Sequence, residues 1–259
     1  MKQSVSVFML TLQSVWKKLI LLFAAMIAAE GVMFALAAGD TLWMEDAIDV
    51  SHLEWIAALA FLCLTLFLLR SSGGSSRQDY TLLRLTVTDK QVFHLRALSF
   101  ALCYLLFWAV QLMLTLVLCK IFASMHSGEP GFGDQTAFLA FYRHPFLHSL
   151  LPMEELTRWL RNLMLLAGLS VAAAGFAGKQ ERKISWSTLV LTALILLTFS
   201  FPMGDMVSDW MISFFALTIL CCISLDSNWK KDTDREVPLD EMLQNMDGSV
   251  QEVESCEET

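Results

Sequence analysis

Residues 70–96 read RSSGGSSRQDYTLLRLTVTDKQVFHLR and form a polar segment between two long apolar runs. The segment concentrates positive charge, and its basic residues are Arg70, Arg77, Arg84, Lys90 and Arg96. Basic residues beside membrane spans stay on the cytoplasmic side. We therefore expect residues 70–96 to be a cytoplasmic loop between two membrane-spanning helices.

The loop has helix signals of its own. Ser76 and Asp79 have the spacing of a helix N-terminus, which predicts a short helix through about Leu85. Thr88 and Gln91 form a second capping box, and the helix that it opens is predicted to run to about Met125. The β-branched run at residues 86–88 disfavours one continuous helix. A short cytoplasmic helix between two spans is what a membrane subunit would present to a soluble partner.

Composition indicates a polytopic membrane protein. The 259 residues are 56% hydrophobic and only 17% charged, with a mean hydropathy of +0.55. The net charge of −8 lies in residues 226–259, which we predict to be an acidic, cytoplasmic and largely disordered tail. The rest of the chain is balanced in charge and has no basic patch of the kind that nucleic acid requires.

The apolar pattern predicts an all-α protein with a six-helix transmembrane domain at residues 19–225. Orientation follows from the basic residues, most of which fall on one side if both termini are cytoplasmic. Residues 125–157 would then be a long external segment, too apolar to be free in water. The predicted spans are Leu19–Ala38, Trp55–Leu69, Ala97–Phe122, Leu160–Ala177, Trp186–Met203 and Trp210–Leu225.

Two further patterns bear on packing. Apolar residues recur at helical spacing in residues 1–18, which predicts an amphipathic helix lying in the membrane interface. The alternative is a cytosolic extension of the first span. In the fourth span, small residues recur four apart, which predicts close helix–helix packing within the subunit or across a dimer. These are Gly168 with Ala172, and Ser170 with Ala174 and Gly178.

Glu30 lies inside the first predicted span. An intramembrane carboxylate is costly unless it is paired or protonated, and it often marks a functional site. Three interpretations stay open: contact with a substrate path, an ion pair with a base such as Arg161, or a protonated side chain.

Other candidate sites are weaker. His144 and His148 are spaced like helical metal ligands, but Pro145 separates them and no third ligand stands out, which favours interfacial histidines. Glu154, Glu155 and Arg158 approach the signature of intramembrane CAAX-type proteases, with the arginine one residue early. The chain has no nucleotide-binding glycine loop and no hydrolase motif. The sequence therefore predicts a non-catalytic subunit without a cofactor or metal of its own.

An amphipathic N-terminal helix, six spans, two internal termini and a capped helix between spans two and three resemble the permease subunits of ABC-type exporters of the second class. The resemblance covers most of residues 1–225. In that family the helix after span two is the coupling helix, which docks in a groove of the ATP-binding subunit. Carried over, this implies a coupling segment at Gln78–Asp89. The implied contacts with the ATPase are Arg77, Asp79, Tyr80, Leu82, Leu83, Arg84 and Leu85.

The resemblance implies a function for the whole chain. It would be a plasma-membrane subunit that exports an amphiphilic cargo (peptide, lipid or drug) by alternating access, with Glu30 a candidate for the translocation path. Its partners would be a soluble ABC ATPase that binds ATP and Mg, a second permease copy or paralogue, and the lipid bilayer. In one respect the chain departs from the family: the large external segment follows span three rather than span five.

Other classes of function stay open. One is an ATP-independent membrane protein, either a stand-alone carrier or an intramembrane hydrolase. A carrier would be expected to show inverted repeats and broken spans, and neither is clear in this sequence. Another is an assembly or sensor protein that acts through its acidic tail.

Overall fold

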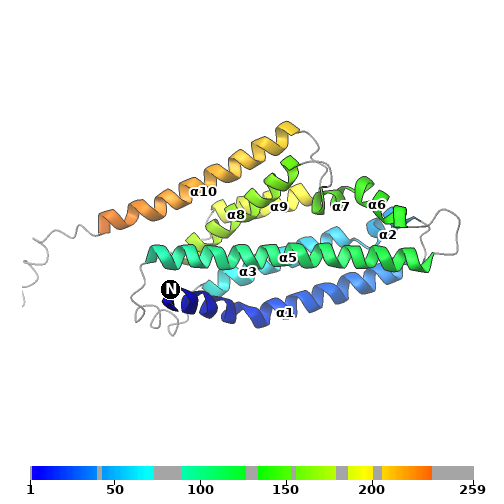
Figure 1. Ribbon diagram of the computed structural model, residues 1–259, viewed down its shortest axis with the longest axis horizontal. Helices are drawn as coiled ribbons and strands as arrows, with labels where there is room; N and C mark the ends of the chain where they lie inside the picture. Colours follow the sequence, from blue (N-terminus) through cyan, green and yellow to red (C-terminus); the bar gives the residue numbers. More distant parts are fainter. Residues whose placement is uncertain are drawn as a thin grey trace, which may run out of the picture. The chain divides into compact units, whose positions relative to one another are not determined.

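The computed structural model describes residues 2–39, 43–72, 89–126, 134–152, 156–178, 186–200 and 206–234. The regular elements in these ranges are all α-helices (Figure 1). They are α1 (Lys2–Ala38), α2 (Met44–Val50), α3 (Leu53–Ser72), α5 (Asp89–Met125), α6 (Asp134–Arg143), α7 (Pro145–Leu150), α8 (Leu156–Gly178), α9 (Trp186–Ser200) and α10 (Met206–Asp234). The chain forms two units, Met1–Leu220 and Cys221–Thr259, and α10 begins in the first and ends in the second.

Five of the described helices are long and apolar enough to cross a membrane, so the chain is an all-α polytopic membrane protein. The helix α9 is shorter. Its 15 residues span about 22 Å at 1.5 Å per residue, against a hydrocarbon core of about 30 Å. The predicted span Trp186–Met203 therefore appears as a shorter apolar helix, and the count of six spans stays a prediction. The five long spans are Val15–Ala38, Leu53–Arg70, Gln91–Met125, Leu156–Phe176 and Met206–Leu225.

The predicted ends of α5 are confirmed, since the helix starts at Asp89, the residue after Thr88 in the sequence, and ends at Met125. Residues 2–18, expected to form an amphipathic interfacial helix, are joined to the first span in one helix, and their place in the membrane interface stays a prediction. The helix α1 is continuous through residues 2–38, because no glycine or proline interrupts it near that position. Figure 1 shows α1 changing direction along its length.

The C-terminal end also differs from the prediction. The helix α10 continues beyond Leu225 to Asp234, so residues 226–234, assigned from the sequence to a disordered tail, are helical. Helix formers such as the lysine pair at residues 230–231 allow the last span to continue. Residues 235–259 lie outside the described ranges.

Within the first unit, α5 contacts both α1 and α8, while α3 contacts α1, α8 and α9. Aromatic side chains join α3 to α5. The ring of Phe61 lies 5.5 Å from that of Tyr104 and 5.7 Å from that of Phe107, measured between centroids. Offset and edge-to-face pairs at such distances add to the free energy gained by burial. These contacts place α3, α5, α8 and α9 around a common interior.

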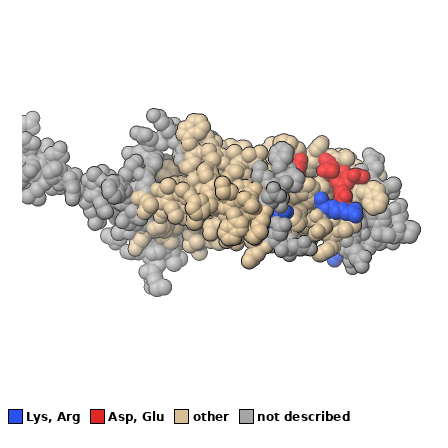
Figure 2. Space-filling view, turned by 90° about the horizontal axis from the view of Figure 1, so that it is seen from above, with Lys and Arg blue, Asp and Glu red and all other residues tan. Residues whose placement is uncertain are grey.

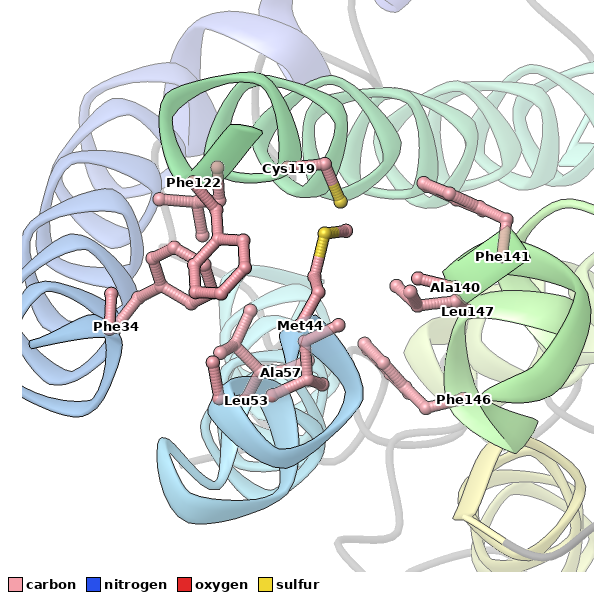
Figure 3. Packing of buried hydrophobic residues seen from close by; sticks show 14 residues of the cluster. Phe34, Met44, Leu53, Ala57, Cys119, Phe122, Ala140, Phe141, Phe146 and Leu147 are labelled. Carbon is pink, nitrogen blue, oxygen red and sulfur yellow. The ribbon is translucent and has the colours of Figure 1, made fainter. Parts of the chain in front are cut away.

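Three short helices, α2, α6 and α7, form what we call the cap, which covers one end of α1, α3 and α5. Figure 3 shows Met44 of α2 between Phe34 and Phe122 on one side and α6 and α7 on the other. The predicted external segment 125–157 therefore buries much of its apolar run against protein. Its buried members include Ala140, Phe141, Phe146 and Leu147.

The first part of α10 meets α8 along a narrow stripe. Asp209, Ser213 and Ala216 are buried, and their spacing of four and three residues puts them on one helix face. At Gly168 of α8 an added Cβ would lie 3.4 Å from the carbonyl oxygen of Ala216. The predicted close packing at Gly168 is confirmed, and it occurs within one chain. The other faces of α10 carry exposed large apolar side chains, among them Met206, Val207, Met211 and Phe214.

Candidate functional site

A cavity of about 50 Å³ lies among α3, α5, α7, α8 and α9. A space of that size has room for a few water-sized molecules and is smaller than the pockets that bind drug-sized ligands. The lining is aliphatic and aromatic apart from a carboxylate and an amide. The lining residues are Glu54, Ala57, Ala58, Phe61, Tyr104, Phe107, Trp108, Gln111, Phe146, Leu150, Leu166, Ile195, Leu196 and Phe199.

The cavity reaches from the cap toward the middle of the helices. On α3 its lining runs from Glu54 to Phe61, about two helical turns or ~10 Å. Phe146 and Leu150 of α7 close the end at the cap. Leu166 of α8 lies three turns into that helix and contributes to the deeper wall.

Two tryptophans hold the end of α7 in place beside the cavity. Trp108 Nε1 on α5 donates to the carbonyl oxygen of Leu150 at 3.0 Å, and Trp159 Nε1 on α8 donates to that of Pro152 at 2.6 Å. The two indole rings lie 5.3 Å apart. Because both N–H groups have partners, the rings can be partly buried without an unsatisfied donor. The position of α7 is therefore tied to both α5 and α8.

Glu30 of α1 is completely buried, and its partner is an amide. Gln111 Nε2 on α5 donates to both Glu30 oxygens, at 2.9 and 3.0 Å. An ion pair with a base such as Arg161, one of the three interpretations left open, is not the contact that the structure shows for Glu30. Glu30 is not among the lining residues, whereas Gln111 is, so the amide stands between the carboxylate and the cavity. Glu30 is thus hydrogen-bonded to an amide, and the interpretations of a protonated side chain and of a place on a substrate path stay predictions.

Arg161 pairs instead with Asp209, the buried carboxylate at the start of α10. The Arg161 Nη1 to Asp209 Oδ1 distance is 2.5 Å, and Arg161 Nε and Nη2 donate to Asn162 Oδ1 at 3.2 and 3.1 Å. Arg158 Nε lies 3.7 Å from Asp209 Oδ2. Asn162 Nδ2 in turn donates to the carbonyl oxygen of Ser149, at 3.0 Å. Two arginines of α8 thus face one carboxylate of α10.

Sequence reasoning missed Gln111 and Asp209. Asp209 lies just outside the predicted span Trp210–Leu225, but α10 already begins at Met206. Each residue had a signal, since Gln111 is an amide inside a long apolar run and Asp209 directly precedes an apolar run. A buried polar side chain needs a partner, which makes such residues candidates for pairing.

The histidines of the cap have partners other than a metal. His144 Nε2 lies 2.9 Å from Asp49 Oδ1 of α2, and the ring of His148 meets that of Tyr142 edge-on at 6.1 Å. Among the described residues, no group of three His, Cys, Asp or Glu side chains could hold a metal ion. Glu154 and Glu155 lie outside the described ranges.

The predicted contacts with an ATPase also lie outside the described residues, since Arg77, Asp79, Tyr80, Leu82, Leu83, Arg84 and Leu85 all fall within residues 73–88. Their role stays a prediction. Comparison with known proteins adds no relative: no family model matches the chain, and no curated protein or solved structure matches it either.

Proposed function

We propose that this chain is the transmembrane permease subunit of an ATP-driven ABC-type exporter in the plasma membrane. It would have six spans, with α9 extended to complete the fifth, and both termini in the cytoplasm. A separate soluble subunit would bind ATP and Mg and hydrolyse the nucleotide. A second permease copy or paralogue would complete the transport path for an amphiphilic cargo.

The observation that carries the proposal is the length of α5. Its 37 residues measure about 55 Å, which exceeds the hydrocarbon core by about 25 Å. The end at Asp89 joins the basic loop, and basic residues beside a span favour the cytoplasmic side. The first turns of α5 would therefore extend from the membrane where residues 78–89 could meet a soluble ATPase.

A double substitution in the loop tests the proposal. Replacing Leu83 and Leu85 by Asp places two charges in a contact that should be desolvated, at a cost of about 2–5 kcal/mol. The variant should insert normally but no longer co-purify with a nucleotide-hydrolysing subunit. The matched control replaces Ser72 and Ser75 by Asp, which adds the same charge to the loop without removing apolar side chains, and should keep the partner.

Two results would count against the proposal. One is a wild-type protein that brings down no ATPase when it is extracted gently from its own membranes. The other is a Leu83→Asp/Leu85→Asp variant that retains the ATPase as fully as the serine control. The first result would favour a stand-alone membrane protein. The second would place the contact outside residues 78–89.

A further inference from the structure

We infer that Glu30 of α1 is a proton-binding site in the interior of the membrane domain, and that Gln111 of α5 binds the neutral acid through two hydrogen bonds. The carboxyl O–H would donate to Gln111 Oε1, and Gln111 Nε2 would donate to the other carboxyl oxygen. The inference does not rest on the proposed export function, because it concerns the protonation of one side chain of the folded protein.

Glu30 is remote from water. It lies in the span Val15–Ala38, eight residues or about 12 Å from the end of the span at the cap, and its side chain is completely buried. Two pairs of aromatic rings lie on either side of it along the contact between α1 and α5. They are Phe23 with Phe107, whose ring centroids are 6.3 Å apart, and Phe34 with Phe122, whose centroids are 6.2 Å apart.

The basic residues of the neighbouring helices do not neutralise Glu30. The helix α1 contacts α2, α3 and α5, and no lysine or arginine in the described parts of these helices forms an ion pair with Glu30. On α5 the basic residue nearest to Gln111 in the sequence is Lys120, which is exposed and lies nine residues or ~13 Å along the helix. A buried carboxylate is costly unless an opposite charge compensates it, so a neutral acid is favoured.

The other ionisable groups on these helices do not favour a charged Glu30 either. The charged residues of α2 and of the first turn of α3 are all acidic, and Figure 2 shows acidic side chains gathered at this end of the molecule with a smaller basic group beside them. They are Glu45, Asp46, Asp49 and Glu54. Away from the ends of α3 and α5, the titratable groups are Cys63, Cys103, Tyr104 and Cys119, and none of these described residues bonds to Glu30.

The hydrogen bonds of Gln111 indicate how the proton would be held. Nε2 donates to both oxygens of Glu30, while Oε1 is buried and has no hydrogen-bond partner among the described residues. Buried polar atoms are rarely left without a partner. A carboxylate can only accept, whereas a protonated carboxyl group also donates. A proton on Glu30 therefore supplies the donor that Oε1 lacks, once the amide turns so that Oε1 and Nε2 each face one carboxyl oxygen.

The proton would affect the contact between two helices. With the proton bound, Glu30 and Gln111 form two hydrogen bonds and bury no charge. Without it, Nε2 faces both oxygens, Oε1 is unpaired, and a negative charge is buried against a neutral amide. Because α1 and α5 meet at this pair, proton binding should stabilise their contact and proton loss should weaken it.

Infrared spectroscopy of the full chain in nanodiscs at neutral pH tests the inference. Labelling with ¹³C-glutamate separates the carboxyl bands of the protein from the ester bands of the lipid. Wild type should show the C=O band of a protonated carboxyl group, and Glu30→Gln should lose it. The matched control is Glu54→Gln, which removes a partly exposed glutamate of α3 and should keep the band.

A second variant tests the role of the amide without removing the acid. Gln111→Leu leaves Glu30 in place but takes away both hydrogen bonds, so the band should persist and move to higher frequency. Met113→Leu, at an exposed position of α5, is the matched control and should leave the frequency unchanged.

The absence of a band that depends on Glu30, or its equal loss in Glu30→Gln and Glu54→Gln, would refute the proton-binding site. A Glu30→Gln variant that does not fold would also refute it, because glutamine resembles the neutral acid in shape and polarity. An unchanged band in Gln111→Leu would refute the pairing with the amide. No ATPase enters these measurements, so their outcome and that of the co-purification test of the loop are separate.

Discussion

Arg161 and Asp209 join α8 to α10 through a charge pair that is removed from solvent. Breaking such a pair from one side leaves an uncompensated buried charge and costs about 3–5 kcal/mol. We expect Arg161→Met to lower the melting temperature markedly, and Arg161→Met/Asp209→Leu to recover part of the loss. Melting curves of the single and double variants in one detergent measure the coupling.

The control for this experiment is Arg143→Met. Arg143 and Glu45 are 3.7 Å apart, but their side chains are 56% and 37% exposed, so their pairing should contribute less than about 1 kcal/mol. Equal destabilisation by Arg161→Met and Arg143→Met would contradict a stabilising role for the buried pair.

Glu30 and Gln111 form the second buried polar pair, this time between α1 and α5. Glu30→Gln should leave folding intact, because the new amide oxygen can accept from Gln111 Nε2. Glu30→Leu removes the acceptor and leaves a buried donor unsatisfied, which should cost about 1–3 kcal/mol. Yield of monodisperse protein and melting temperature measure both effects.

Removing both partners provides the control for Glu30. Glu30→Leu/Gln111→Leu should be more stable than Glu30→Leu alone, since no polar group then remains without its partner. Failure of Glu30→Gln to give folded protein would mean that a charged Glu30 is required.

At the residue scale, the sequence identifies Glu30 and Arg161 as polar residues that need partners if they are buried. It does not identify the partner of either residue. Glu30 binds a residue 81 positions away and Arg161 one 48 positions away. Pairing at such separations depends on which helix faces meet, and hydropathy carries no information about that. The cavity could not be located from the sequence either, because its lining comes from five helices and depends on which of their faces meet.

At the element scale, the crossing of α8 and α10 depends on a small residue at position 168. A Cβ there would lie 3.4 Å from the Ala216 carbonyl oxygen and 3.6 Å from Leu191 Cδ1, which is ordinary contact. Gly168→Ala should therefore be tolerated, with a change in stability below about 1 kcal/mol. Gly168→Leu should push α10 away from α8, since a branched side chain has no room at this distance.

Separation of α10 can be followed by a cysteine at Ser213, a buried position of the α10 stripe. In a chain without its native cysteines, Ser213→Cys should react slowly with a membrane-permeant maleimide, and faster once Gly168→Leu is added. Equal rates in the two backgrounds would show that Gly168 does not control the crossing.

Helix ends were predictable where local signals are strong. The threonine at position 88 directly precedes the observed start of α5, and the glycine and proline residues that follow Met125 in the sequence come shortly after its observed end. Residues 2–18 and the first span form one helix, because a change from amphipathic to apolar pattern alters the environment of a helix without ending it. From the sequence, the part of the cap in the segment 125–157 could be recognised only as an apolar run. Its burial depends on contacts with α2, which the sequence pattern does not reveal.

At the scale of the whole molecule, the orientation of the spans can be tested by labelling. In a chain without native cysteines, Ser75→Cys and Ser227→Cys should react only with reagents that reach the cytoplasm, and Ser127→Cys should react from outside. Labelling of Ser75→Cys by an impermeant external reagent would reverse the orientation. That result would also remove the basis for an ATPase contact in the loop.

The unbroken length of α5 has a mechanical consequence. Residues 89–125 contain neither glycine nor proline, the usual causes of sharp kinks, so the helix should respond to force as a stiff rod. The helix packs against α1 and α8, and these contacts could act as the point about which it tilts. A tilt of about 10° about that point would move each end of a ~55 Å rod by about 5 Å. A displacement of the end at Asp89 would thus be transmitted, with little loss to bending, to the opposite end of α5, where the helix contacts the cap.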